Sequence, residues 1–229
     1  MRPVRTARTA AAALSVLTAL LSPTTAHAAQ PSRFAAPGDT VTLPVRDALA
    51  ALPVRTEDRT GYERTKFKHW TDADRDGCNT RMEVLKAEAV TAPVQGPNCI
   101  LTGGSWYSSY DDRYLDSASK LDVDHLVPLA EAWDSGASQW TAKERELYAN
   151  DLDYARDLIA VSAASNRSKA DKDPGEWLPP FAGYRCQYDT DWIADKTRWG
   201  LSIDTTERDA LTQQLADCPD RPVTVTLAR

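Results

Sequence analysis

Two short polar segments carry the residue types that hydrolysis of a phosphodiester requires. Asp124 and His125 are adjacent in the first segment, and Asn166 lies in the second. An imidazole with its ordinary pKa of about 6.5 can accept a proton from water near neutral pH. Aspartate and asparagine oxygens are hard ligands that suit Mg²⁺, which keeps several of its waters. Taken as chemistry, the set offers an imidazole that can act as a base and hard oxygens that suit one divalent cation.

This chemistry requires that strands and a helix bring the two segments together. Residues 121–128 are predicted as an extended segment that ends at a proline, and 157–161 as a second strand. Ser162 can then cap a helix that carries Asn166. Asp124 and His125 would point to opposite faces of an ideal strand, so the strand must end or bend here for both to reach one cation.

A structural reading of the same residues stands beside the catalytic one. An isolated histidine such as His125 can cap a strand, and Asn166 can bond the backbone of its own helix. Asp122 is predicted to support the site or the strand edge rather than to bind metal. The complete set, in chain order, favours catalysis.

The segment 122–128, Asp-Val-Asp-His-Leu-Val-Pro, with the later Ser-Asn-Arg-Ser-Lys at 165–169, resembles the HNH, or ββα-metal, nucleases. More narrowly, the chain resembles secreted bacterial HNH-endonuclease family proteins related to the C-terminal domain of GmrSD restriction enzymes. The resemblance implies a strand–strand–helix finger that holds one divalent ion, usually magnesium. In that finger Asp124 would be the metal carboxylate, His125 the general base and Asn166 the residue that completes the site.

The sequence departs from the pattern of that family in two places. Asn166 occupies a position where many HNH enzymes have a second histidine. The interval between His125 and Asn166 is also long, and we assign the extra length to a helical insertion that contains Trp133 and Trp140.

Three basic residues, Arg167, Lys169 and Lys172, lie on or just after the predicted finger helix. They are predicted to contact the phosphate backbone of a substrate. The alternative is a solvated helix face balanced by Asp171 and Asp173. The chain carries a formal net charge of −6, so binding of a polyanion must depend on a local patch or on bound cations.

A second acidic pattern is a candidate calcium site. Asp72, Asp74 and Asp76, followed by Glu83, match the ligand spacing of an EF-hand loop. The alternative is an Asp-rich turn whose side chains cap a helix that begins at Thr80. The sequence leaves both interpretations open.

The N-terminal segment predicts export. Three arginines precede an apolar run over residues 10–21, and Ala-His-Ala follows at 26–28. This order is typical of a secretory signal peptide, here residues 1–28. The apolar run is short for a bilayer crossing, which needs about 20 residues. We therefore expect a secreted protein without a membrane anchor.

The four cysteines fit an oxidising compartment. Cys78, Cys99, Cys186 and Cys218 are an even set, which predicts two disulfides. Pairing the first with the second and the third with the fourth closes two short loops and is favoured, although sequence leaves three pairings open. A zinc site would need paired Cys-x-x-Cys spacing, which is absent from the sequence.

The 229 residues, 42% of them hydrophobic, have the composition of a globular protein rather than a disordered or fibrous one. Residues 29–60 are predicted as a leader and 61–229 as the nuclease domain. The predicted fold class is α+β: an HNH finger with a helical insertion, surrounded by additional helices and short strands. Helices are predicted over 45–52, 61–70, 80–89, 129–133, 141–148, 191–199 and 206–217, and strands around a turn over 100–110.

Taken together, the sequence predicts a secreted, monomeric, metal-dependent HNH endonuclease that hydrolyses phosphodiester bonds in DNA, with RNA as a further substrate. Its cofactor would be one Mg²⁺, with a structural Ca²⁺ in the acidic loop as an additional ion. One alternative is a calcium-stabilised extracellular binding or wall-associated module on an inactive nuclease scaffold. A second is a metal-dependent phosphodiesterase for small phosphate esters.

Overall fold

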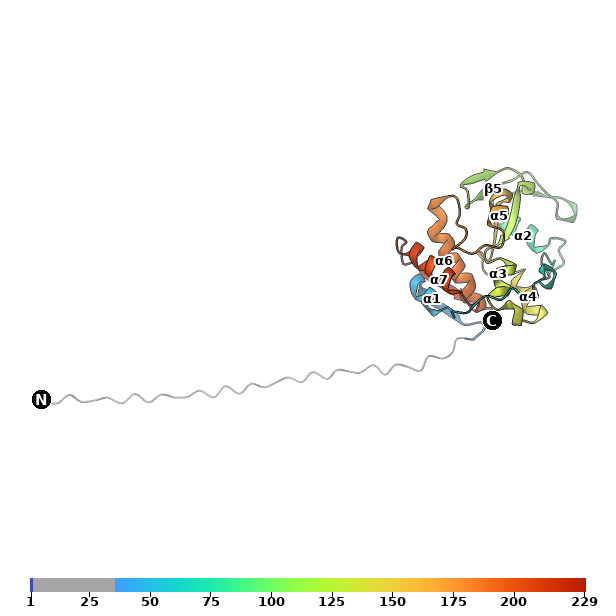
Figure 1. The fold of residues 1–229 in the computed structure, drawn as a ribbon. Coiled ribbons are helices and arrows are strands. Elements are labelled where there is room, and N and C mark those ends of the chain that lie inside the picture. The colour runs from blue at the N-terminus through green and yellow to red at the C-terminus, as the bar shows by residue number, and fades with distance from the viewer. Residues whose placement is uncertain (2–35) are drawn as a thin grey trace. The chain divides into compact units, whose positions relative to one another are not determined.

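The computed structural model describes Met1 and residues 36–229 (Figure 1). The predicted signal peptide, 1–28, and the first residues of the predicted leader lie outside this range. Within the described residues, no helix combines the length and the apolar character that a bilayer crossing requires.

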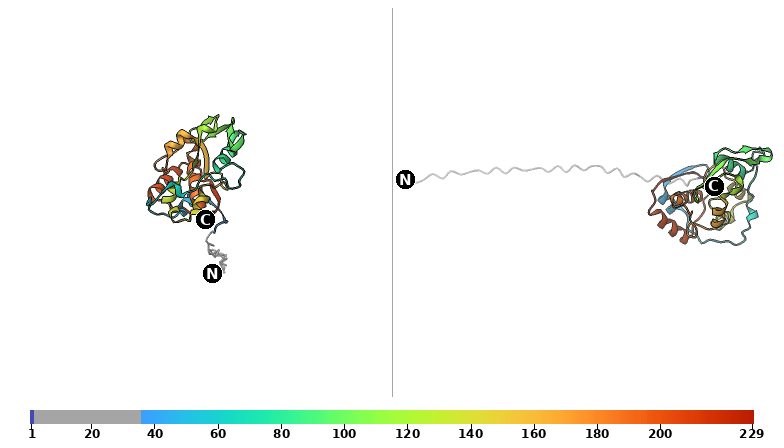
Figure 2. Two further views of the ribbon diagram at one scale, coloured as in Figure 1. Left: turned by 90° about the vertical axis from the view of Figure 1, so that its right-hand side faces the viewer. Right: turned by 90° about the horizontal axis from the view of Figure 1, so that it is seen from above.

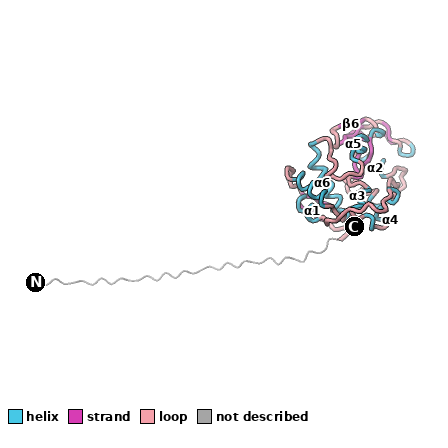
Figure 3. The backbone as a smooth tube through the Cα atoms, in the orientation of Figure 1, coloured by secondary structure: helices cyan, strands magenta, loops and turns pink. Residues whose placement is uncertain are grey.

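The described chain is α+β, as predicted. The helices are α1 (Val45–Ala51), α2 (Thr80–Ala87), α3 (Leu129–Asp134), α4 (Ala142–Tyr148), α5 (Ala163–Lys169), α6 (Ala182–Trp199) and α7 (Thr205–Leu215). The strands are β1 (Thr40–Pro44), β2 (Ala89–Thr91), β3 (Val94–Gln95), β4 (Leu101–Thr102), β5 (Ser105–Ser108), β6 (Arg113–Leu115), β7 (Leu121–His125), β8 (Leu158–Ser162) and β9 (Pro222–Thr226). Loops and turns connect these short elements over much of the chain (Figure 3).

Among the described residues, the strands form small antiparallel sheets rather than one large sheet. The pairings are β1–β9, β2–β5–β6, β3–β4 and β7–β8. The strands predicted around the turn at Gly103-Gly104 exist as β4 and β5, but they pair with different partners rather than with each other.

Part of the segment predicted as a leader, residues 29–60, has regular secondary structure. Residues 40–51 form β1 and α1, and β1 pairs with β9 along its whole length, from Thr40 with Thr226 to Pro44 with Pro222. Leu43 in β1 is partly buried and packs against the main core. The helix was predicted over 45–52, but β1 was not, because it depends on a partner strand far away in the sequence.

The main core lies where α1, α6 and α7 pack against one another and against β9, which Figures 1 and 2 show from three sides. Buried side chains from these elements include Val45, Leu49, Trp192, Ile193 and Leu211. A second core lies on one face of β7 and β8, where α2 and Trp106 cover it. The site described below is built at the end of β7, between these cores.

Local signals decided several element boundaries. Thr141 and Glu144 form the predicted reciprocal capping box at the start of α4. Gly200, with φ of 63°, ends α6 as predicted, because glycine tolerates the left-handed conformation. The helix predicted over 61–70 is wrong: only Arg64–Lys66 forms a 3₁₀ turn.

Both favoured disulfides are confirmed. Cys78 bonds Cys99 and Cys186 bonds Cys218. The first bond ties the start of α2 to the segment before β4, and the second ties α6 to the residues after α7. Each disulfide therefore joins two segments that are otherwise connected only through the chain between them.

Candidate active site

The site is built on the β7–β8 hairpin and on α5. The two strands are antiparallel, with Asp124 opposite Ile159 and His125 opposite Leu158. Helix α5 begins directly after β8, where the Ser162 hydroxyl accepts a hydrogen bond from the Ser165 backbone N–H, as predicted. The chain between the strands contains α3 and α4, which correspond in position to the predicted helical insertion.

The three residues predicted to do the chemistry line one pocket. Its volume is about 250 Å³, and Asp124, His125 and Asn166 are all in its wall. His125 is the last residue of β7, so the strand ends where two neighbouring side chains must reach the same space. The remaining lining residues are Arg64, Val123, Pro128, Arg167, Ala170 and Asp171.

The His125 ring is buried and held in one orientation. Its Nε2 lies 3.0 Å from the backbone oxygen of Ala149, and Trp70 stacks on the ring with a centroid distance of 5.1 Å. Because a carbonyl can only accept, Nε2 carries the proton and Nδ1 of the neutral ring is left with a free lone pair. Burial lowers the pKa of His125 to about 3, so the ring is neutral at physiological pH.

Asp124 is also buried, and its contacts leave one oxygen for a ligand. The Tyr110 hydroxyl donates a hydrogen bond to Oδ2 at 2.7 Å, and the Lys169 ammonium lies 2.7 Å from the same atom. Burial raises the pKa of Asp124 above its ordinary value, although Lys169 opposes this shift. Among the described residues, no side chain bonds Oδ1 of this carboxylate, which lines the pocket.

The predicted contact between Lys169 and a substrate phosphate does not fit the structure. The side chain of Lys169 is fully buried, and its ammonium also donates to the His125 backbone oxygen at 3.1 Å. An ammonium enclosed in this way cannot reach a nucleic acid backbone. Lys169 lies one turn after Asn166 on α5, and its side chain points inward to Asp124. Spacing in the sequence alone could not show whether this side chain points inward or outward.

Asn166 is oriented by Asp122 on the same hairpin. The Asn166 Nδ2 group donates to Asp122 Oδ2 at 3.2 Å, so this hydrogen bond does not use the amide oxygen of Asn166. Arg167 approaches the same Asp122 oxygen at 3.6 Å. Asp122 therefore has the supporting position that the sequence predicted.

The exposed cations at the pocket include one that the sequence analysis missed. Arg167, whose side chain is 77% exposed, and Arg64 both line the pocket, and Lys172 is exposed just beyond α5. Arg64 lies far from the motif in sequence, so no spacing signal connected it to the site. Tyr110 and Trp70 were also missed as site residues, because in the sequence both resemble aromatic residues of a core.

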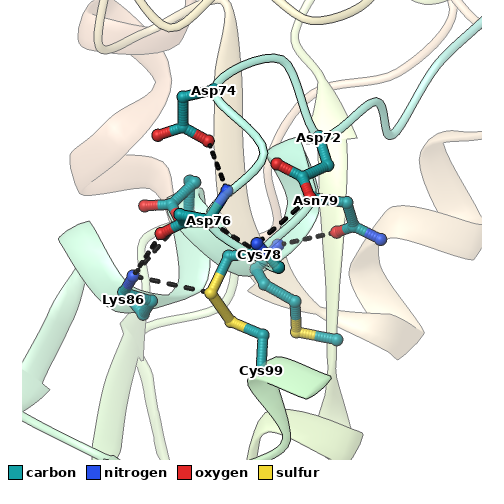
Figure 4. Close-up of a disulfide and its surroundings, with 10 residues drawn as sticks. Asp72, Asp74, Asp76, Cys78, Asn79, Lys86 and Cys99 are labelled. Carbon is teal, nitrogen blue, oxygen red and sulfur yellow. Dashed lines mark hydrogen bonds and ion pairs between the residues drawn. A yellow bond between two sulfur atoms is a disulfide. The ribbon is translucent and has the colours of Figure 1, made fainter. Parts of the chain in front are cut away.

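In the acidic loop, three of the predicted calcium ligands come together (Figure 4). Carboxylate oxygens of Asp72, Asp74 and Asp76 lie within 4.8 Å of one another. Each also accepts from a backbone N–H of the loop itself: Gly77 donates to Asp72, Asp76 to Asp74, and Cys78 to Asp76.

The fourth predicted ligand, Glu83, has a carboxylate oxygen within 4.8 Å of one of Asp76, but it is not grouped with Asp72 and Asp74. Its carboxylate lies 3.1 Å from the ammonium of Lys86, which also approaches Asp76 at 4.0 Å. The helix-capping alternative also differs in detail, because Asn79 rather than an aspartate caps α2. Calcium binding by this loop stays a prediction.

Comparison with known proteins identifies the family. Residues 85–214 match the model of the GmrSD restriction endonucleases, C-terminal domain. The chain belongs to this family. The matched residues include Asp124, His125 and Asn166, whereas Arg64 and Trp70 lie before them.

A relative from Arthroderma benhamiae, named "Uncharacterized secreted protein", is 42% identical over 171 residues, which cover 74% of this chain and 82% of the relative. The protein is secreted, in agreement with its two disulfides. This relative is fungal, so the predicted restriction to bacteria is not confirmed. No solved structure matches the chain.

Proposed function

We propose that this secreted protein is a metal-dependent endonuclease of the HNH type, which hydrolyses phosphodiester bonds in DNA and also in RNA. The observation that carries the proposal is the shared pocket of Asp124, His125 and Asn166, in which the imidazole has an unprotonated Nδ1. In this proposal β7, β8 and α5 are the ββα-metal finger.

His125 is the general base of the proposed reaction. The Ala149 carbonyl fixes its tautomer, and Trp70 fixes the plane of the ring. A neutral imidazole held in this way can take a proton from water at Nδ1 without first losing one to solvent. The orientation costs no rearrangement when substrate binds, because both contacts exist in the free protein.

Asp124 and Asn166 are the proposed ligands of one Mg²⁺. The donor set fits this ion, because Oδ1 of Asp124 and the amide oxygen of Asn166 are hard oxygens without other side-chain partners among the described residues. A bound Mg²⁺ would supply a positive charge that stabilises the phosphate and the leaving oxygen. Lys169 and Tyr110 hold the carboxylate in place from the protein interior.

Exposed cations at the pocket are proposed to bind the phosphate backbone. Arg64 and Arg167 come from different elements that line the same pocket, and Lys172 lies beyond α5. The net charge of −6 gives the protein no general attraction for a polyanion, so substrate binding must depend on these local charges and on the cation. Such contacts hold the backbone without reading its sequence.

A plasmid-nicking assay on the mature, oxidised protein tests this proposal. We expect conversion of supercoiled plasmid to nicked and linear forms with MgCl₂ and none with EDTA, and a parallel reaction with single-stranded RNA. A chromogenic phosphodiester serves as the comparison substrate. Cleavage of that small ester alone would favour a phosphodiesterase, and cleavage of none of the three substrates would contradict the assignment.

A further inference from the structure

A cluster of carboxylates surrounds Glu57, and none of its members lines the His125 pocket. Oxygens of Glu57, Glu131 and Asp134 lie within 4.8 Å of one another, and so do oxygens of Glu57, Asp204 and Glu207. These residues come from the segment after α1, from α3 and from the start of α7. Glu57 belongs to both groups and is therefore at the centre of five acidic side chains.

Two basic side chains approach this cluster. Lys196 is fully buried, and its ammonium lies 2.8 Å from Glu131 and 2.6 Å from Glu207. Arg59 lies 2.6 Å from Asp134 and is half exposed. Two positive charges thus face five carboxylates, and among the described residues no ion pair involves Glu57.

Buried oxygens in this cluster lack hydrogen-bond partners. Oε1 of Glu57 and Oδ1 of Asp134 are both inaccessible to solvent and accept no bond from the described residues. The side chain of Asp134 is only 2% exposed, with Arg59 bonded to its other oxygen. Buried acceptors are normally satisfied by protein, water or a ligand, so these two oxygens indicate that a partner is missing at this cluster.

The contacts also indicate which of the two groups would take that partner. On the α7 side, Glu207 accepts from Trp192 and Lys196 on its two oxygens, and Asp204 caps the helix by accepting from the Glu207 N–H. On the α3 side, the contacts of Glu131 with Lys196 and Ser135 both fall on Oε1. Unused oxygens are therefore concentrated in the group on the α3 side.

We propose that Glu57, Glu131 and Asp134 bind a structural divalent cation of the Ca²⁺ or Mg²⁺ class. Three carboxylates supply the hard oxygens that these ions prefer, and water can complete the coordination. The ion would join the segment after α1 to α3, the first helix after β7.

Protonation of Glu57 is the competing way to relieve the repulsion. Burial, together with the charges of Glu131 and Asp204, raises the pKa of Glu57 to about 8. A proton on Glu57 would remove one charge and supply one donor, but it would leave the cluster independent of added metal. The two possibilities therefore differ in their response to Ca²⁺ and Mg²⁺.

The test compares the full mature protein with Glu57→Gln after treatment of both with EDTA and gel filtration. Asp116→Asn is the matched control: it makes the same change at an exposed side chain, whose ion-pair partner among the described residues is Lys120. Thermal unfolding at pH 7.5 is followed with CaCl₂ and MgCl₂ in separate titrations, and bound metal is counted by equilibrium dialysis.

We expect the melting temperature of the parent protein to rise by about 5–10 °C when the ion reaches a hundred times its Kd. Glu57→Gln should bind one ion fewer per chain and lose that part of the rise, while Asp116→Asn should match the parent. Glu57→Gln should fold at least as well as the parent without metal, because it replaces a carboxyl whose ionisation the neighbouring acids oppose. Asp134→Asn provides a second ligand variant with the same expected loss of one ion.

An equal number of bound ions in the parent, Glu57→Gln and Asp134→Asn would overturn the proposal. So would a melting temperature of the parent that neither ion raises, since a proton alone would then satisfy the cluster. These measurements do not depend on nuclease activity, so failure of the nuclease assignment would leave the result of this test unchanged.

Discussion

The His125 pocket and the Asp72–Asp76 loop both have residues at the spacing of a metal site, but the structure organises them differently. In the pocket, partners distant in sequence hold the side chains: Ala149 holds His125, and Lys169 holds Asp124. In the loop, the aspartates accept from backbone N–H groups only two to five residues away. Asp124 and His125 are buried, whereas the three aspartates of the loop are exposed.

The comparison shows that side chains can have the sequence spacing of a metal site without being held in position for a ligand. The acidic loop satisfies much of its own hydrogen bonding, so its carboxylates have a role without any ligand. The pocket residues are held by the tertiary structure in positions that leave His125 Nδ1 and Asp124 Oδ1 free of side-chain contacts among the described residues. Groups fixed in this way need little rearrangement when a substrate binds, and such groups are the ones expected to do chemistry.

The largest effect is expected from His125→Ala. Removal of a general base lowers the rate of a reaction by about 10²–10⁴-fold, and we expect plasmid nicking to fall within that range. His69→Ala is the matched control, because its ring lies 6.4 Å from that of His125 but has no role in the proposed reaction. Circular dichroism checks that both variants fold. Nicking by His125→Ala at the parent rate would refute the role of this residue.

Lys169→Met should have the next largest effect, a decrease in the free energy of unfolding. Loss of the ammonium leaves the buried Asp124 carboxylate without its counter-charge, which typically costs about 3 kcal/mol or more. Urea unfolding should show this loss, while Lys172→Met, at an exposed lysine, should change stability by less than about 0.5 kcal/mol. Equal effects of the two substitutions would show that the interior position of Lys169 is not its important property.

Asp122→Ala should weaken cation binding at the pocket without removing a proposed ligand. Residues that orient a metal ligand typically contribute tenfold or more to affinity, so the Mg²⁺ concentration for half-maximal nicking should rise about tenfold. The rate at saturating Mg²⁺ should fall less. Asp116→Ala, which removes an exposed acid outside the pocket, is the control. An unchanged Mg²⁺ requirement would mean that Asn166 does not need Asp122 for its orientation.

Asp74→Asn should have the smallest effect. Asp74 is exposed, so we expect a change in stability within about 0.5 kcal/mol and an unchanged nicking rate. A calcium titration of the melting temperature completes the comparison of the two regions. If Asp74→Asn removes a calcium-dependent rise that Glu57→Gln retains, the loop is the calcium site and its carboxylates are more than a self-satisfied turn.

The parts of the fold that follow local rules were predictable from the sequence. The capping box at Thr141 and the stop of α6 at Gly200 depend on residues a few positions apart, and the strand–strand–helix order around Asp124 depends on short patterns within each element. The pairing of cysteines was also favoured correctly, since both bonds close short loops.

The parts that depend on long-range contacts were not predictable. Strand β1 forms by pairing with β9. The path of residues 68–71 is held by the side-chain amide of Asn150, which donates to the Lys68 backbone oxygen and accepts from the Thr71 N–H. The same holds for the site, because a backbone carbonyl such as that of Ala149 has no signature in sequence. The direction of Lys169 depended on where α5 lies against β7.

The β1–β9 sheet joins residues far apart in sequence, from Thr40 opposite Thr226 to Pro44 opposite Pro222. A chain exported with its N-terminus first can start to fold at once, but it cannot pair these strands until its final residues have emerged. The β1–β9 sheet can therefore form only after residues 222–226 are available, and a chain that lacks them would leave β1 without its partner strand.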